Sequence, residues 1–321
     1  MSNYNYCRSL ITDVEVENFV DAVLNIKEPM KKRNAINLIT NAERNINWYD
    51  VSTLNNMEFR DFEYRSKDKR EELRTRILYD LIHRTRLVDD ENICLNKGGA
   101  KPRTDLKAEY KLFYIIGPPA SGKSTISNTI ADKFGAYILD SDYVKRKLPE
   151  YKNQVGGASL IHDESDVLVF SYDHPNNLLA HCLKFGYNMV IPKIGYDIQA
   201  TCNLCLTIKK RGYSIYLVSV DLDRAKATIR AYNRFKKTKR YVPLSLIFDY
   251  YGNDPILNYF RLKQRFSDIF EGFIQLSTDV GFGKQPILIE QINAEFIMDI
   301  YGGFEDERNV QKSKYGLCTV E

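Results

Sequence analysis

Apolar residues in the first hundred positions recur with the spacing of helices. A capping box at residues 12–15 begins the first pattern, which continues until the Glu28-Pro29 dipeptide interrupts it. Its apolar residues share one helical face: Val16, Phe19, Val20, Val23 and Leu24. Similar spacing predicts a second helix near residues 36–48 and a third, strongly charged one across residues 67–88. We therefore predict an all-helical N-terminal region over residues 1–104.

The pattern changes after residues 97–103, a stretch of turn formers in which Ala is the only apolar residue, so we place a domain boundary there. Five apolar runs of strand length follow, at residues 112–116, 136–139, 188–191, 214–220 and 286–289. Helical segments are predicted around them, at residues 158–171, 175–186, 198–211 and 255–274. This alternation is typical of an α/β domain, here residues 105–321, with a mostly parallel five-stranded sheet flanked by helices.

A phosphate-binding loop is predicted between the first strand and the following helix. The pattern G-x-x-x-x-G-K-[ST] is matched by Gly117, Pro118, Pro119, Ala120, Ser121, Gly122, Lys123, Ser124 and Thr125. Such loops turn backbone N–H groups toward phosphates, and the helix adds its positive N-terminal dipole. Lys123 would bind the β- and γ-phosphates of ATP or GTP, and the Ser124 hydroxyl would bind Mg²⁺. The alternative is an ordinary strand-to-helix turn.

Two carboxylates follow the second predicted strand, at Asp140 and Asp142. Open parallel sheets bind ligands at the carboxyl ends of their strands. One carboxylate can support the Mg²⁺ shell, and the other can accept a proton from a substrate hydroxyl that attacks the γ-phosphate. We assign these roles to Asp140 and Asp142 respectively. The alternative is a helix N-cap followed by a solvated acid.

Positive charge is concentrated in residues 222–241. This stretch holds eight basic residues and one acidic residue, a local charge of +7, whereas the whole chain carries +4. Lys226, Arg230 and Arg234 are spaced by four and would form one helical stripe, and Arg240 follows. Guanidinium groups near a phosphate loop can neutralise charge that develops in the transition state, so Arg230, Arg234 and Arg240 are candidate catalytic residues. The alternative is a solvated basic face.

Composition excludes several other classes. The chain has 321 residues, 44% hydrophobic and 27% charged, which suits roughly two globular domains. A total charge of +4 argues against a protein that coats nucleic acid. No apolar run approaches the roughly 18 residues of a membrane span, and no signal peptide is evident. The six cysteines are too sparse for a disulfide scaffold, so we expect a cytoplasmic protein without membrane or nucleic-acid partners.

Taken together, these segments resemble the zeta toxins, a family of P-loop kinases. The resemblance covers about residues 110–245 and is carried by the phosphate loop, by the run from Asp140 to Tyr151, by residues 158–165 and by the Arg-bearing stretch. It implies ATP- or GTP-dependent phosphorylation of a hydroxyl of UDP-N-acetylglucosamine, which would poison cell-wall synthesis. It also implies that Asp142 is the catalytic base, Lys123 the loop lysine, and Arg230 and Arg240 the arginines that contact the phosphates.

One departure from the family pattern concerns the acceptor. Many zeta toxins have an acidic residue just after the third strand, whereas this chain has Lys193. Lysine only donates hydrogen bonds, so it cannot reproduce the sugar contacts of a carboxylate. Lys193 would instead suit an anionic acceptor, unless it is only an exposed loop lysine. Together with Lys193, the candidate substrate-binding residues are Lys145, His162 and Glu164; the alternative for His162 is capping or packing.

Several functions stay open at this point. The acceptor could also be a nucleoside, a dinucleotide or an antibiotic, and the protein could instead be a nucleotide-gated binding module. The N-terminal region could be a scaffold, a cap that selects the substrate, or an inhibitor fused in cis. The last hypothesis follows from the resemblance, because zeta toxins are silenced by a small helical antitoxin that blocks the nucleotide site.

Overall fold

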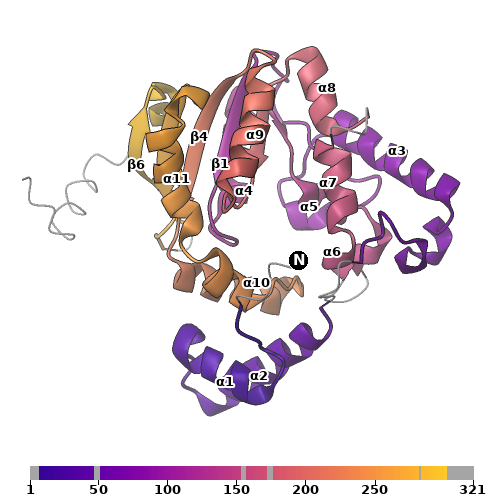
Figure 1. Cartoon of the computed structure of the whole chain (residues 1–321), viewed down its shortest axis with the longest axis vertical. Coiled ribbons are helices and arrows are strands. Elements are labelled where there is room, and N and C mark those ends of the chain that lie inside the picture. Colours follow the sequence, from indigo (N-terminus) through magenta and orange to yellow (C-terminus); the bar gives the residue numbers. More distant parts are fainter. Residues whose placement is uncertain (1–6, 47–50, 153–156, 172–175, 282, 302–321) are drawn as a thin grey trace, which may run out of the picture.

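The structure is a computed structural model that describes residues 7–46, 51–152, 157–171, 176–281 and 283–301. Its centre is a six-stranded sheet with strand order β2-β3-β1-β4-β5-β6 (Figure 1). The strands are β1 (Lys111–Ile116), β2 (Tyr137–Ile138), β3 (Met189–Pro192), β4 (Ser214–Asp221), β5 (Gly272–Ser277) and β6 (Ile287–Ile292). All neighbouring pairs are parallel except β5 and β6. The mostly parallel α/β sheet is thus confirmed.

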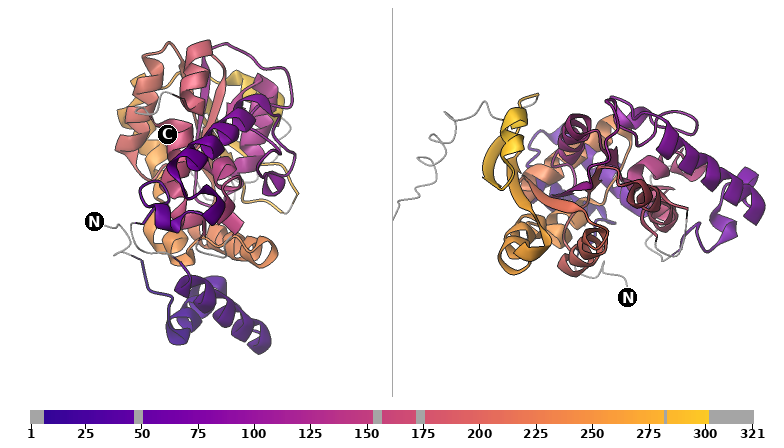
Figure 2. Two further views of the ribbon diagram at one scale, coloured as in Figure 1. Left: turned by 90° about the vertical axis from the view of Figure 1, so that its right-hand side faces the viewer. Right: turned by 90° about the horizontal axis from the view of Figure 1, so that it is seen from above.

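Helices cover both faces of this sheet. The described helices are α1 (Asp13–Phe19), α2 (Pro29–Arg44), α3 (Lys67–His83), α4 (Lys123–Phe134), α5 (Ser141–Lys145), α6 (Gly157–Leu160), α7 (His162–Phe170), α8 (Leu178–Phe185), α9 (Ile198–Lys209), α10 (Arg224–Thr238), α11 (Asp254–Arg265) and α12 (Met298–Tyr301). Neighbouring residues of β1 show the two faces, since Phe113 packs against Phe134 of α4 and the Tyr114 hydroxyl lies 3.5 Å from the Thr201 hydroxyl of α9. Figure 2 accordingly shows α4 and α9 on opposite sides of the sheet.

Three details differ from the sequence prediction. The sheet has a sixth strand, because residues 272–277 form β5 rather than the end of the helix expected at 255–274. Pro29 begins α2 at its first turn instead of interrupting a helix, as suits a residue without an N–H to satisfy. The third predicted helix ends at His83, and the chain then continues as an irregular segment.

The first helices form a small core of their own against α10. Residues 13–44, here called the N-terminal hairpin, comprise α1, a π-helical turn at Val20–Leu24, and α2. Their buried side chains include Phe19 and Ile39, which belong to the same cluster as Ala231 and Phe235 of α10. In Figure 1 the hairpin lies beneath α10, away from the sheet. The hairpin therefore supports the side of α10 that faces away from the basic residues.

Residues 51–101, here called the connecting segment, pack differently. Leu73, Ile77 and Leu81 of α3 are fully buried in the main hydrophobic core together with the sheet residues. Arg70 of the same helix is fully buried and forms ion pairs with Glu150 (2.8 Å) and Glu164 (2.6 Å). The helical character of the N-terminal region is thus confirmed, whereas a boundary at residue 104 stays a prediction.

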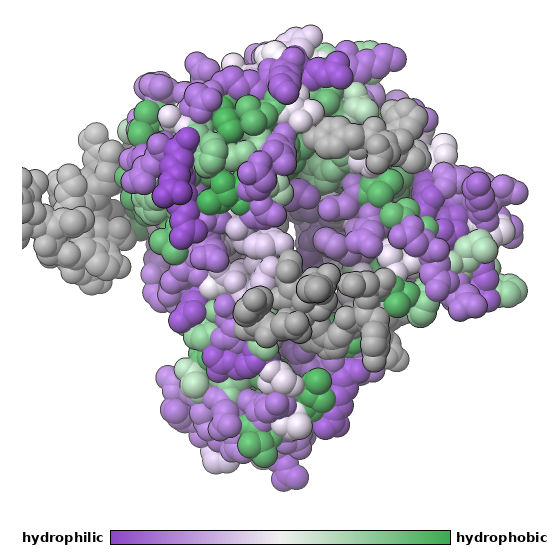
Figure 3. All heavy atoms as spheres, viewed as in Figure 1, coloured by the Kyte–Doolittle hydropathy of each residue, from purple (hydrophilic) through white to green (hydrophobic). Residues whose placement is uncertain are grey.

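The visible face of the molecule is mostly hydrophilic, with separated apolar patches (Figure 3). Within the described residues, no helix is both long and apolar enough to cross a membrane.

Candidate active site

A cavity of about 610 Å³ opens at the carboxyl ends of β1, β2 and β3. It collects predicted residues from five separate segments of the chain. Those that line it are Pro119, Ala120, Gly122, Lys123, Ser124, Thr125, Asp140, Asp142, Lys145, His162, Lys193, Arg230, Arg234 and Arg240. Gly117, Pro118, Ser121 and Glu164 were also predicted as site residues but are not part of this lining.

Two glycines explain the shape of the phosphate loop. A Cβ atom on Gly117 would lie 2.5 Å from the carbonyl oxygen of Val220, so only glycine lets β1 continue into the loop beside β4. Gly122 has φ 91°, a left-handed conformation that favours glycine, directly before α4 begins at Lys123. The loop thus presents the first turn of α4, with Ser124, to the cavity.

Lys123 is bound by its own loop. Its Nζ donates hydrogen bonds to the carbonyl oxygens of Gly117 (2.7 Å) and Pro118 (2.8 Å). Burial lowers the pKa of Lys123 to about 7, although the nearby Asp140 carboxylate opposes this shift. A triphosphate would offer this ammonium stronger acceptors than two carbonyl groups do, because charged acceptors form the stronger hydrogen bonds.

Asp140 and Asp142 have distinct positions. The Asp140 carboxylate accepts a hydrogen bond from the Asp142 backbone N–H (2.9 Å) and so caps α5, while it also lines the cavity. Burial and the neighbouring Asp142 charge raise the pKa of Asp140. Burial also raises the pKa of Asp142, but Arg240 and Lys145 outweigh it and hold that pKa well below its usual range. The N-cap interpretation and the site interpretation of this segment are therefore compatible.

The basic residues of α10 separate into two groups. Arg230 and Arg234 line the cavity, and Arg230 Nη2 donates to the carbonyl oxygen of Thr278 at 2.7 Å. Lys226 of the predicted stripe instead forms an exposed ion pair with Asp279 (2.6 Å). Burial, together with the Arg240 charge, lowers the pKa of Arg234 to about 10. We refer to residues 222–241 as the lid.

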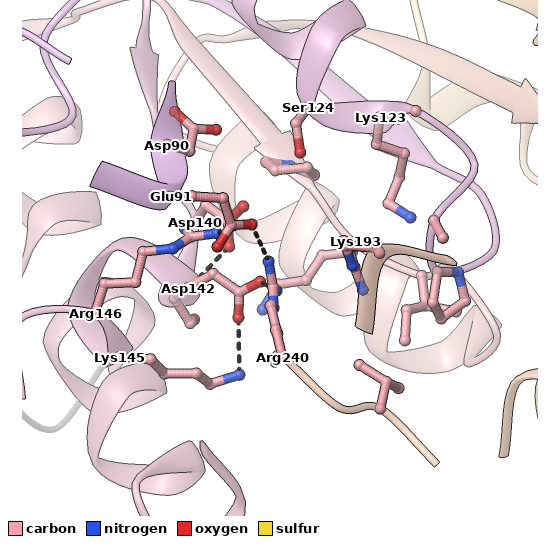
Figure 4. A pocket seen from close by; sticks show the side chains of 18 of the residues that line it. Asp90, Glu91, Lys123, Ser124, Asp140, Asp142, Lys145, Arg146, Lys193 and Arg240 are labelled. Atoms are coloured by element: carbon pink, nitrogen blue, oxygen red, sulfur yellow. Dashed lines mark hydrogen bonds and ion pairs between the residues drawn. The ribbon is translucent and has the colours of Figure 1, made fainter. Parts of the chain in front are cut away.

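Arg240 is the lid residue that reaches the candidate base. One guanidinium nitrogen forms an ion pair with the Asp142 carboxylate, and another lies 3.4 Å from Glu91. Lys145 contacts the other Asp142 oxygen at 3.1 Å. Figure 4 shows Asp142 between Lys145 and Arg240, with Glu91 above Asp142 and linked to the same arginine. The candidate base is thus surrounded by cations.

The acceptor end of the cavity contains a carboxylate that the sequence did not single out. Asp166 of α7 lies 3.5 Å from Lys193 and accepts a hydrogen bond from the Ser141 hydroxyl. The Lys193 ammonium also stands 3.8 Å above the Phe170 ring centre. Burial, followed by the Lys145 charge, lowers the pKa of His162 in the same wall. An acidic side chain thus does lie beside Lys193 at the end of β3, but it comes from α7 and not from the segment after β3.

Glu164 occupies a structural position away from this wall. Its carboxylate accepts hydrogen bonds from Arg70 (2.6 Å), Arg74 (2.8 Å) and the Thr53 hydroxyl (2.5 Å). Burial raises its pKa, but the Arg70 partner outweighs this effect and lowers it to about 2. These contacts join α3 to α7, so Glu164 acts there as a buried counter-ion and does not reach the cavity.

Among the cavity residues that the sequence analysis did not single out are Glu91, Arg146 and Asp166. Arg146 had appeared only as part of the segment after Asp142, although it lies one turn further along the same cavity wall. Glu91 precedes the phosphate loop by more than twenty positions, so no local spacing connects it to the site. Only Asp166 had a signal, because it follows His162 by one helical turn.

The residues assigned to Mg²⁺ fit a hard cation. Ser124 and Asp140 offer a hydroxyl and a carboxylate oxygen in one cavity, which are ligands that Mg²⁺ prefers. No group of three or more His, Cys, Asp or Glu side chains suited to a metal occurs among the described residues. At phosphate sites Mg²⁺ usually binds one or two protein oxygens and takes its other ligands from phosphates and water.

A known protein family matches this region of the chain. The zeta toxin family model matches residues 99–255, which include the phosphate loop, both aspartates and the lid. A curated relative is tRNA dimethylallyltransferase of Anaplasma marginale (strain St. Maries), which is 33% identical over 70 residues. That match covers 21% of this chain, and the chain spans only 22% of that enzyme.

Solved structures show more distant likenesses. The PezAT toxin-antitoxin system of Streptococcus pneumoniae matches at a TM-score of 0.48 and 15% identity, with 78% of this chain and 95% of that chain covered. The AvrRxo1-ORF1:ORF2 complex matches at a TM-score of 0.43 and 16% identity, with 79% and 77% covered.

Proposed function

Because the chain belongs to the zeta toxin family through residues 99–255, we propose that it is a P-loop kinase that phosphorylates a hydroxyl group of a small molecule. The observation that carries the proposal is the meeting of three parts in one cavity. These parts are a phosphate loop with Lys123, a carboxylate base at Asp142, and the lid arginines. Positioning and charge neutralisation are what phosphoryl transfer asks of a protein, and these three parts supply both.

Each part has a defined role in the proposed reaction. The loop and Lys123 hold the β- and γ-phosphates of ATP or GTP, while Mg²⁺ at Ser124 and Asp140 would neutralise phosphate charge. The oxygen of the acceptor hydroxyl forms a bond to the γ-phosphorus, and Asp142 accepts the proton of that hydroxyl. The bond between the γ-phosphorus and the leaving ADP or GDP breaks. Arg230, Arg234 and Arg240 stabilise the negative charge on the transferring group.

Nearby cations limit the basicity of Asp142. Its low pKa means that it is ionised at neutral pH, but its contacts with Arg240 and Lys145 make it a weak proton acceptor. A nucleotide that draws Arg240 toward its phosphates would relieve one of these contacts. Asp142 would then be a stronger base in the nucleotide-bound enzyme than in the free enzyme.

For the acceptor, we propose a nucleotide sugar such as UDP-N-acetylglucosamine. Asp166 can accept hydrogen bonds from sugar hydroxyls beside Asp142, and Lys145, His162 and Lys193 can donate to anionic groups. The family supports action as a toxin in the cytoplasm, and a separately encoded antitoxin is then the expected protein partner. Because Lys193 stands where many relatives carry an acid, a nucleoside, a dinucleotide or an antibiotic is the second candidate acceptor.

A mass-spectrometric assay tests the proposal. The full chain is incubated with ATP or GTP, Mg²⁺ and a panel of nucleotide sugars, nucleosides, dinucleotides and hydroxylated antibiotics. We expect one member to gain the mass of a single phosphate, and Lys123→Ala to abolish this gain. If no acceptor is phosphorylated while the nucleotide is bound and slowly hydrolysed, the protein is a nucleotide-gated module instead.

A further inference from the structure

Glu91 contacts the candidate active site from outside the segment that matches the family. Its Oε1 accepts from Arg240 Nη1 (3.4 Å) and from Arg146 Nη2 (3.2 Å). It belongs to the connecting segment and lies at the cavity wall near α5 (Figure 4). Of the described residues that precede the family match at residue 99, only Val88, Asp89, Asp90 and Glu91 line the cavity.

The kinase core fixes the position of this short stretch. Lys147, which is 2% exposed, donates from Nζ to the carbonyl oxygens of Cys94 (2.9 Å) and Gly98 (2.6 Å) and to the Asp80 carboxylate (2.8 Å). The Tyr143 hydroxyl donates to Asp90 at 3.3 Å. Because Lys147 holds the backbone at Cys94 and Gly98 and Tyr143 contacts Asp90, the fold determines the position of Glu91.

Arg240 consequently lies between two carboxylates. Asp142 binds one of its terminal nitrogens and Glu91 the other, while Lys145 binds the second Asp142 oxygen and Arg146 shares Glu91 Oε1 with Arg240. The two carboxylates thus neutralise the Arg240 charge in its present position, where the side chain is only 18% exposed. An arginine that already binds two carboxylates gains less free energy from binding a phosphate than an arginine that is surrounded by water.

We propose that Glu91 is a positioning residue that holds Arg240 on the base side of the cavity and thereby weakens the binding of the nucleotide triphosphate. A triphosphate competes with the two carboxylates for the same guanidinium group. The Glu91 charge also repels the phosphates directly, because both are anionic and share one cavity. The proposal rests on the proposed function, since it takes the phosphate loop as the nucleotide site.

This role gives the N-terminal region an influence on the site without blocking it. None of the described residues of the N-terminal hairpin lines the cavity, so the hairpin does not occupy the nucleotide site. The restraint instead acts through one carboxylate and one guanidinium group. It keeps the base covered until enough nucleotide is present to draw Arg240 away.

The test measures binding of ATP with Mg²⁺ to the full chain by calorimetry, without any acceptor. Glu91→Gln keeps the size of the side chain and an oxygen acceptor but removes the charge. We expect it to tighten ATP binding about three- to tenfold, which is the range for a partly buried charged pair. Glu72→Gln, on the exposed side of α3, is the matched control and should bind ATP as the wild type does.

A double-mutant cycle separates the two ways in which Glu91 could act. In an Arg240→Gln background the carboxylate has lost the partner it is proposed to hold, so Glu91→Gln should then change ATP binding by less than about twofold. A KM for ATP that falls while kcat is maintained would agree with this, whereas a structural role would impair both.

The outcomes are distinct. If Glu91→Gln leaves ATP affinity unchanged or weakens it, or if its full effect persists without Arg240, the positioning role is wrong while the kinase proposal stands. If the wild-type chain binds no ATP or GTP at all, the proposed function is wrong and the inference falls with it.

Discussion

The two halves of the N-terminal region are related to the rest of the molecule in different ways. The N-terminal hairpin shares a small separate core with the lid, to which it is joined by the Tyr241–Glu43 hydrogen bond. Arg8, just before the hairpin, also forms an ion pair with Asp249, just after the lid (2.7 Å). The connecting segment belongs to the main core and carries Glu91 into the cavity. The hairpin therefore lies next to the site only through the lid, whereas the connecting segment is part of the main core and also lines the cavity.

Truncation tests this difference most strongly. A chain that begins at Thr104 loses Leu73, Ile77 and Leu81 from the main core and leaves Glu150 and Glu164 without Arg70. We expect it to show no cooperative thermal unfolding by circular dichroism, because an unpaired buried charge and a large core defect add together. A chain that begins at Val51 should keep a cooperative transition. If both chains unfold alike, the two halves are not distinct.

Loss of the buried ion pairs of α3 should cause the next largest decrease in stability. Arg70→Met removes the cation shared by Glu150 and Glu164 and should lower the free energy of unfolding by about 3–5 kcal/mol. Denaturant titration of the full chain measures it. Lys69→Met, at an exposed neighbouring position of the same helix, should change it by no more than about 0.5 kcal/mol. Equal losses in both variants would show that the pairs contribute nothing specific.

The hairpin makes a smaller contribution to the free energy of unfolding, and this contribution depends on pH. Burial raises the pKa of Glu43 from 4.5 to about 7, although its hydrogen bond with Tyr241 opposes the shift. The folded state therefore binds this proton more tightly than the unfolded state, so stability falls as pH rises from 4.5 to about 7.

Glu43→Gln should flatten this fall by at most about 1 kcal/mol per pH unit in denaturant titrations, because its side chain cannot ionise. Glu58→Gln, an exposed carboxylate of the connecting segment, should keep the wild-type slope. If Glu43→Gln keeps the wild-type slope of the free energy of unfolding against pH, ionisation of Glu43 is not the cause of that slope.

The parts of the site that the sequence predicted are those defined by local spacing. The phosphate loop, the Asp140 and Asp142 pair and the arginines of the lid each lie within one short segment, and the fold places them around a common cavity. The strand β5 escaped prediction because Phe270 and Phe273 continue the apolar spacing of the preceding helix.

The missed contacts depend on partners far apart in the chain. Glu164 pairs with Arg70 across 94 positions, so its sequence context at the start of a helix gave no sign of a buried counter-ion. Glu91 and Arg240 are separated by 149 positions and meet in a fold in which Lys147 holds the loop that follows Glu91. The acidic residue sought beside the third strand is likewise found on α7, at Asp166.

The central claim is that Asp142 accepts the proton of the acceptor hydroxyl. The most direct measurement is the single-turnover rate of phosphate transfer from saturating ATP to the acceptor identified by mass spectrometry, for the full chain and for Asp142→Asn. We predict that the variant binds ATP at least as tightly as the wild type but transfers phosphate about 10²–10⁴-fold more slowly. Transfer at the wild-type rate would contradict the assignment of the base.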